Sequence, residues 1–124
     1  MIRVKRVYDA PDEGDGFRVL VDRLWPRGLS KEKAKVDLWL REVSPSDGLR
    51  KWYSHDPRKW DLFRERYAGE LSHREGLLER IGAIEQENGR VTLLFGSKEP
   101  RINNAVALQM MLESRANRGR KRTG

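Results

Sequence analysis

Four short segments of the chain carry the apolar pattern of β-strands. Residues 2–8 start with an alternation of apolar and polar side chains, and residues 91–95, VTLLF, are apolar except for Thr92 and indicate a buried strand. Residues 17–21 end in three consecutive apolar side chains, as expected where both faces of a strand are covered. The pattern of residues 36–40 fits either a further strand or an extended buried segment.

Apolar residues at helical spacing fill the intervals between these strands. The predicted helices cover residues 31–35, 47–54, 57–71 and 73–88, and a last one starts after residue 100. Ser30 and Asp56 are the expected N-caps of the first and third helices, and Pro57 suits the first helical position. Ser72 and Glu75 have capping-box spacing before the fourth helix. Strands interleaved with helices predict a small, mainly parallel sheet covered by helices, in a single three-layer α/β domain.

Composition and charge indicate how far this domain extends. The 124 residues are 37% apolar and 36% charged, which suits one compact folded domain. The net charge is +7, and the last ten residues contribute five basic side chains and no acid, namely Arg115, Arg118, Arg120, Lys121 and Arg122. We therefore expect residues 1–114 to form the domain and residues 115–124 to form a basic, disordered tail. Such a tail would contact nucleic acid weakly and nonspecifically.

Several classes of chemistry are excluded by what the sequence lacks. The chain has no cysteine, which excludes disulfides, thiolate metal sites and cysteine nucleophiles. His55, His73 and the scattered acids lack metal-ligand spacing, and no nucleotide-binding glycine motif occurs, so neither a metal nor a cofactor is expected. No apolar run approaches the roughly 20 residues of a membrane span, and no apolar segment follows the basic N-terminus. We expect a cytoplasmic protein without membrane contact, and the oligomeric state stays open.

The candidate site consists of two turns that each follow a predicted buried strand, VDRLWPRG at 21–28 and GSK at 96–98. The polar side chains that these turns contribute are Asp22, Arg23, Arg27, Ser97 and Lys98. In a parallel sheet the carboxyl ends of the strands lie at one edge, where loops gather around ligands. Two guanidinium groups and an ammonium group suit a phosphate, a sulfate or a carboxylate. The turns therefore predict a pocket for a small anionic molecule, such as a nucleotide or a phosphate ester.

Asp22 and His55 are the candidate catalytic residues. Asp22 would orient an arginine or act as a base, although an ion pair with Arg23 that only stabilises the loop fits the sequence equally well. His55 suits proton transfer near neutral pH, although its place directly before Asp56 and Pro57 also fits a helix-capping turn.

Four stretches of the sequence are distinctive. They are KRVYD at 5–9, VLVDRLWPRG at 19–28, LRKWYSHDPRKWDLFRERYAGEL at 49–71 and TLLFGSKEPRINNAVAL at 92–108. Together they resemble the YeaO-like family of uncharacterised bacterial proteins, domain-of-unknown-function family 488. The resemblance spans almost the whole chain except the basic tail. It implies an α/β fold with a parallel sheet and brings no established reaction.

The resemblance also carries expectations about single residues. Longer relatives in this group have an aspartate and an arginine in the loop after the second strand, which Asp22 and Arg23 match. They also have Asn-His-Ala near the start of the last helix, where this chain has Asn103, Asn104 and Ala105. Asn103 and Asn104 are therefore candidate ligand contacts. Asparagine forms hydrogen bonds but does not transfer a proton near neutral pH, so this departure argues against catalysis and leaves binding untouched.

Three functions are compatible with these observations. The first is a pocket that binds, and in one version processes, a small anionic molecule. The second is a nucleic-acid-associated protein that is held by residues 115–124 and stacks Trp25 on bases. The third is a sensor that binds a metabolite without turnover.

Overall fold

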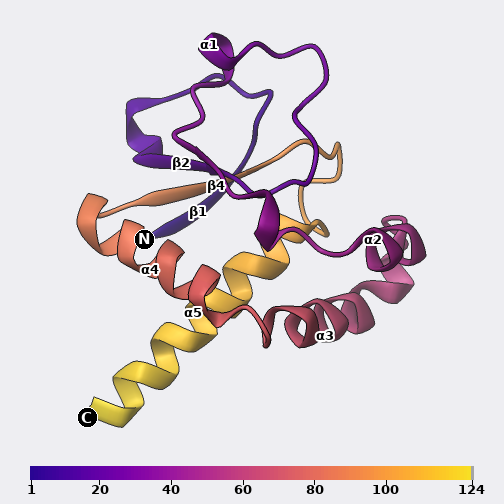
Figure 1. Ribbon diagram of the computed structural model, residues 1–124, viewed down its shortest axis with the longest axis vertical. Helices are drawn as coiled ribbons and strands as arrows, with labels where there is room; N and C mark the ends of the chain where they lie inside the picture. Colours follow the sequence, from indigo (N-terminus) through magenta and orange to yellow (C-terminus); the bar gives the residue numbers. More distant parts are fainter. Residues whose placement is uncertain (124) are drawn as a thin grey trace.

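The computed structural model describes the backbone of residues 1–123 and the side chains of residues 1–118. At its centre lies a parallel sheet with the strand order β1-β4-β2-β3 (Figure 1). The strands are β1 (Ile2–Arg6), β2 (Phe17–Leu20), β3 (Leu38–Trp39) and β4 (Val91–Phe95). The protein is thus a small α/β domain, as predicted. Because the strands run in one direction, their carboxyl ends meet at a single edge of the sheet.

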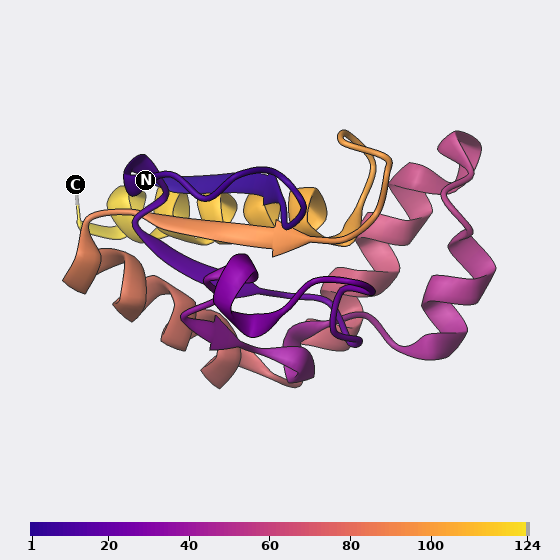
Figure 2. The same cartoon turned by 90° about the horizontal axis from the view of Figure 1, so that it is seen from above.

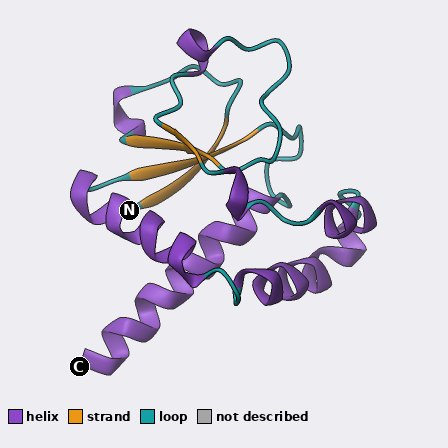
Figure 3. Ribbon diagram, viewed as in Figure 1, coloured by secondary structure: helices purple, strands orange, loops and turns teal. Residues whose placement is uncertain are grey.

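The helices are arranged around this sheet in three groups. They are α1 (Lys31–Ala34), α2 (Asp47–Tyr53), α3 (Trp60–Leu71), α4 (Glu75–Asn88) and α5 (Asn104–Thr123), with 3-10 turns η1 (Glu13–Asp15), η2 (Arg41–Val43) and η3 (Pro57–Lys59). α4 and α5 pack on one face, whereas α1 and the loop after β2 cover the other (Figure 3). α2 and α3 stand beyond the carboxyl end of β4 (Figure 2). The carboxyl edge therefore faces α2 and α3.

The sheet separates two apolar clusters, because neighbouring side chains of a strand point to opposite faces. On one face, Val19 of β2 and Leu93 of β4 join the large core that α3, α4 and α5 complete. On the other face, Leu20 and Leu94 pack against Ala34 of α1 and the loop after β2. Packing on both faces explains why β4 is apolar except at Thr92, which is fully buried and donates its hydroxyl to the Asp15 carbonyl at 2.6 Å.

Local signals in the sequence determine several helix starts. The side chain of Ser30 accepts the N–H of Lys33 at 3.2 Å, and that of Asp56 accepts the N–H of Arg58 at 3.0 Å. Both predicted N-caps are therefore confirmed, although the turn after Asp56 is η3 and α3 begins only at Trp60.

The capping box predicted for Ser72 and Glu75 is wrong. The Ser72 hydroxyl donates to the Gly69 carbonyl at 2.6 Å, and the residue before α4 is Arg74, which makes no side-chain cap. Ser72 keeps a helical backbone and closes α3, so its hydroxyl faces back along that helix.

The last helix continues beyond the point where the sequence predicted a disordered tail. α5 runs from Asn104 to Thr123, and Arg115 lies 3.5 Å from Glu75 of α4. The basic segment has few apolar residues, but arginine, lysine and alanine all favour helix, which apolar periodicity alone does not register. The domain boundary at residue 114 stays a prediction, and the side chains of residues 119–124 lie outside the described part of the chain.

A buried ion pair joins β2 to η1 and β1. Asp15 and Arg18 are 3% and 4% exposed, and Arg18 Nη1 lies 2.5 Å from Asp15 Oδ2. Lys5 Nζ contacts the same carboxylate at 3.1 Å. Burial raises the pKa of Asp15, but a backbone N–H, Lys5 and Arg18 together outweigh that effect and hold the pKa below its ordinary value of 3.8. The ion pair is therefore a structural interaction that holds η1 and β1 to β2.

Asp15→Asn is expected to lower the free energy of unfolding by about 3 kcal/mol, because it leaves Arg18 buried without its carboxylate. In the unsubstituted protein this stabilisation is present above the ordinary pKa of Asp15 and is lost as the pH falls through the lowered folded-state pKa. Urea denaturation at neutral and acidic pH measures both effects. Asp61→Asn, which changes an exposed carboxyl of α3, is the control. Equal stability of the Asp15→Asn and unsubstituted proteins at neutral pH would contradict this role.

Candidate functional site

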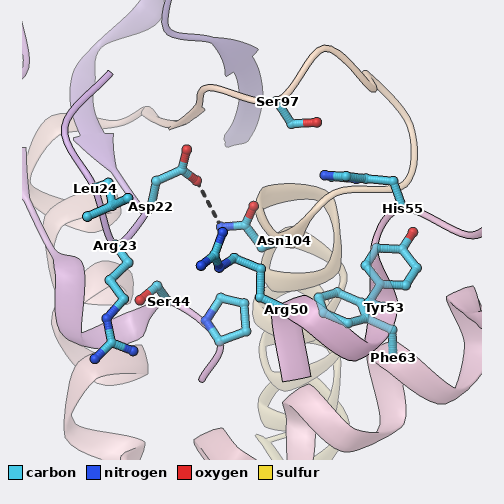
Figure 4. A pocket seen from close by; sticks show the side chains of 11 residues that line it. Asp22, Arg23, Leu24, Ser44, Arg50, Tyr53, His55, Phe63, Ser97 and Asn104 are labelled. Carbon is cyan, nitrogen blue, oxygen red and sulfur yellow. Dashed lines mark hydrogen bonds between the residues drawn. The ribbon is translucent and has the colours of Figure 1, made fainter. Parts of the chain in front are cut away.

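A cavity of about 270 Å³ lies at the carboxyl edge of the sheet, between the loops after β2 and β4 and the start of α5 (Figure 4). Its less exposed polar lining residues are Asp22, Ser44, Ser97 and Asn104. Exposed polar residues form its rim, namely Arg23, Arg50 and His55. Apolar side chains complete the lining, namely Leu24, Pro45, Tyr53 and Phe63. The cavity therefore combines a cationic rim, a polar inner wall and an apolar wall.

Asp22 holds the inner wall together. Its Oδ2 accepts the N–H of Gly96, in the loop after β4, at 2.7 Å. Its Oδ1 accepts Asn104 Nδ2 at 3.1 Å, and the same amide nitrogen donates to the Val21 carbonyl at 3.2 Å (Figure 4). One carboxylate thus ties the loop after β2 to the loop after β4 and to the first residue of α5.

The surroundings of Asp22 influence its ionisation in opposite directions. Burial raises its pKa above the ordinary value of 3.8, and this is the largest effect. The hydrogen bonds from Gly96 and Asn104 and the charges of Arg50 and His55 lower the pKa and oppose burial. A carboxyl in a cavity with a raised pKa is typical of a functional site.

The two rim arginines converge on one carboxylate that the sequence did not single out. Arg23 Nη1 lies 3.6 Å from Asp47 Oδ1, and Arg50 Nη2 lies 3.3 Å from the same oxygen. Asp47 is the first residue of α2, directly after its N-cap Ser46, where an acid is favoured. All three side chains are about half exposed. The loop after β2 is thereby joined to α2 across the mouth of the cavity.

The apolar wall contains a stacked aromatic pair, and the one hydroxyl in it is bonded to the chain. The rings of Tyr53 and Phe63 stack with centroids 4.2 Å apart, and both residues are buried. The Tyr53 hydroxyl donates to the Ile102 carbonyl at 2.7 Å. Burial, with smaller effects from two nearby acids, raises the pKa of Tyr53 to about 12, so the phenol is neutral at physiological pH. Leu24 is 70% exposed and extends this apolar surface at the rim.

His55 points into the cavity from the turn between α2 and η3 (Figure 4). Its backbone is left-handed, with φ 56°, and its ring lies 5.7 Å from that of Tyr53. His55 lies between Ser54, the C-cap of α2, and Asp56, the N-cap of η3, so its backbone is part of the helix-capping turn, as the alternative predicted. Its side chain makes no hydrogen bond to another residue of the described part of the chain.

The structure brings five of the predicted site residues to one cavity: Asp22, Arg23, His55, Ser97 and Asn104. The predicted alternative of an Asp22–Arg23 ion pair does not form, because Arg23 contacts Asp47 and Asp22 binds Gly96 and Asn104. Asp22 and Arg23 therefore have separate partners.

The other predicted residues lie away from the cavity. The Trp25 ring packs edge-on against Trp39 and donates to the Leu29 carbonyl at 2.6 Å. Asn103 is fully buried and caps α5, because its Oδ1 accepts the N–H of Val106. Arg27 and Lys98 have exposed side chains outside the lining. Trp25 thus has a packing role. Of the three predicted cationic residues, only Arg23 lines the cavity.

Six lining residues were not placed in the site by the sequence analysis, namely Leu24, Ser44, Pro45, Arg50, Tyr53 and Phe63. Both aromatic residues fit the apolar faces of predicted helices, and Arg50 lies on the polar face of one of them. A usable signal was the helix start after Ser44-Pro45-Ser46, because a helix that follows a strand of a parallel sheet begins near the carboxyl edge.

These features define a small α/β protein with a polar cavity at the carboxyl edge of a parallel sheet. A family model described as the inactive DUF488-N3 subclade matches residues 1–123. The chain is 40% identical over 113 residues to the uncharacterised protein YeaO of Escherichia coli strain K12, which covers 91% of this chain and 97% of YeaO. Uncharacterised proteins of Mycobacterium bovis and Mycobacterium tuberculosis are 39% identical over 116 residues, 92% of this chain and 95% of each relative. The chain therefore belongs to domain-of-unknown-function family 488, and the resemblance to its YeaO-like members is confirmed.

No solved structure matches the chain. Within the described residues, no group of three or more histidine, cysteine or acidic side chains is placed to hold a metal ion. No described helix is both long enough and apolar enough to cross a membrane.

Arg50→Ala is expected to raise the pKa of Asp22 further, because the arginine charge is one of the effects that lower it. Carboxyl carbon NMR during a pH titration measures this shift directly. Arg58→Ala removes an exposed arginine that pairs with Asp56, and it serves as the control. An unchanged or lower pKa of Asp22 in Arg50→Ala would show that this arginine does not act on the inner wall.

Proposed function

We propose that the protein binds a small anionic molecule in the cavity at the carboxyl edge of the sheet and does not convert it. The observation that carries this proposal is the convergence of Arg23 and Arg50 on the carboxylate of Asp47 at the cavity mouth. Two guanidinium groups that already share one anionic oxygen are placed to bind another anion. Ser97 and Asn104 offer further polar atoms on the inner wall.

Binding without turnover is supported because the residues in the positions of a general base or acid are poorly suited to proton transfer. Both oxygens of Asp22 accept hydrogen bonds from the protein, which favours an organising role over that of a base. Asn104 stands where the family resemblance expects histidine, and an amide does not exchange protons near neutral pH. The family model that the chain matches is also described as inactive. His55 is then a hydrogen-bonding contact for the ligand. The proposal includes a cytoplasmic location.

Stacking on nucleic acid through Trp25 loses support, because that ring packs against Trp39 and its N–H is bonded to the chain. A contribution of residues 115–124 to nucleic-acid binding stays an alternative outcome of the experiment below. It is separable from the cavity by substitution.

Arg50→Ala is expected to weaken binding of a small anion about tenfold, since a hydrogen bond to a charged group contributes roughly 1.5 kcal/mol or more and tenfold corresponds to about 1.4 kcal/mol. Isothermal titration calorimetry with benzoate, sulfate and inorganic phosphate measures the affinities. Arg27→Ala and Lys98→Ala, which change exposed cations outside the cavity, are matched controls and should bind as the unsubstituted protein does.

A full-length variant with glutamine at Arg118, Arg120, Lys121 and Arg122 tests the alternative. It leaves Arg115 in its contact with Glu75. The proposal expects unchanged binding of the three probes in this variant. Loss of all binding there, together with unchanged binding in Arg50→Ala, would refute the cavity as the site.

A further inference from the structure

Asp47 does not line the cavity itself, but it contacts both of the arginines that form the cavity rim. The same oxygen, Oδ1, lies within 3.6 Å of Arg23 and 3.3 Å of Arg50. Its side chain is about half exposed, so an incoming anion can approach the arginines beside it. An anion bound there is close to the carboxylate and is repelled by it.

The net charge around the cavity mouth is small. Arg23 and Arg50 supply two positive charges, and Asp47 cancels one of them. Asp22 faces the cavity from the inner wall and adds negative charge when it is ionised. A singly charged anion is balanced by such a rim, whereas a doubly charged anion keeps an unbalanced charge and has more hydration to lose.

The apolar wall of the cavity indicates what kind of group carries the anionic group of the ligand. Tyr53 and Phe63 form a stacked pair, and Pro45 and Leu24 flank the same space. The Tyr53 hydroxyl is bonded to the Ile102 carbonyl, and Tyr53 and Phe63 are only 3% and 1% exposed. The accessible apolar surface of this wall therefore comes largely from Leu24, which is 70% exposed. An apolar group fits such a wall, as in most pockets where a few polar groups orient an otherwise apolar ligand.

We propose that the cavity takes a monoanionic carboxylate carried by an apolar group, and that Asp47 is the residue that selects against dianionic phosphate esters. This inference rests on the proposed function, because it specifies the ligand of the same site. Asp47 acts on affinity through its charge and does not need to touch the apolar part of the ligand.

The experiment compares benzoate with phenyl phosphate, which share the ring and differ in charge, at a pH where the phosphate carries two charges. Unsubstituted protein is expected to bind benzoate more tightly. Asp47→Asn removes one negative charge at roughly 4 Å in a solvated site, which should strengthen benzoate binding about threefold. The Coulomb energy doubles with the ligand charge, so phenyl phosphate should gain the square of that factor, about tenfold.

Asp61→Asn is the matched control, because Asp61 also lies in the first turn of a helix and pairs with an arginine three residues later. It should leave both affinities unchanged. Circular dichroism and thermal unfolding check that each variant folds, and the half-exposed position of Asp47 makes the substitution tolerable.

The outcomes separate the two proposals. Equal gains for both ligands in Asp47→Asn, no gain for either, or tighter binding of phenyl phosphate by the unsubstituted protein would overturn the selectivity assigned to Asp47. The proposed function would still stand if Arg50→Ala weakens binding of whichever anion is bound. Absence of binding for every anion tested, or binding that is indifferent to Arg50→Ala, would overturn both.

Discussion

The cavity depends on the carboxylate of Asp22, because this group joins three segments that the strand order alone leaves separate. Its oxygens accept hydrogen bonds from Gly96 after β4 and from Asn104 at the start of α5. Burial raises the pKa of this carboxyl, and the two donors and the charge of Arg50 act against that rise. The loops are thus organised around a carboxyl whose pKa is raised by burial, whereas the pKa of Asp15 in the ion pair with Arg18 is lowered, and a raised carboxyl pKa is more typical of a site.

Asn104 has a structural role in the inner wall, and it also stands where the resemblance leads us to expect a histidine. Its amide nitrogen donates to Val21 and to Asp22, so it supports the inner wall as well as lining it. The resemblance places a histidine at this position in longer relatives. Asparagine keeps hydrogen-bonding capacity and loses proton transfer. This loss of proton transfer at the inner wall is one of the reasons for proposing binding without turnover.

The sequence was sufficient to predict which residues meet at the carboxyl edge of the sheet. It was insufficient to predict which cationic side chains form the rim of the cavity. Two buried strands and the rule for parallel sheets brought Asp22 and Ser97 together, because both follow directly from strand ends. Arg27 and Lys98 were expected beside them as chain neighbours, but side chains leave a turn in several directions, and the Arg27 carbonyl instead accepts the Tyr8 hydroxyl. Arg50 reaches the site only through the packing of α2 beyond the sheet, which no local pattern specifies.

The most direct test of the central claim is a titration of benzoate into nitrogen-15-labelled protein, followed by NMR of backbone and side-chain N–H groups. The account predicts saturable chemical-shift changes at the Gly96 backbone amide, the Asn104 side-chain amide and the Arg50 guanidinium, which lie on two sides of the cavity. Changes confined to residues 115–123, or no saturable change at these three groups, would contradict it.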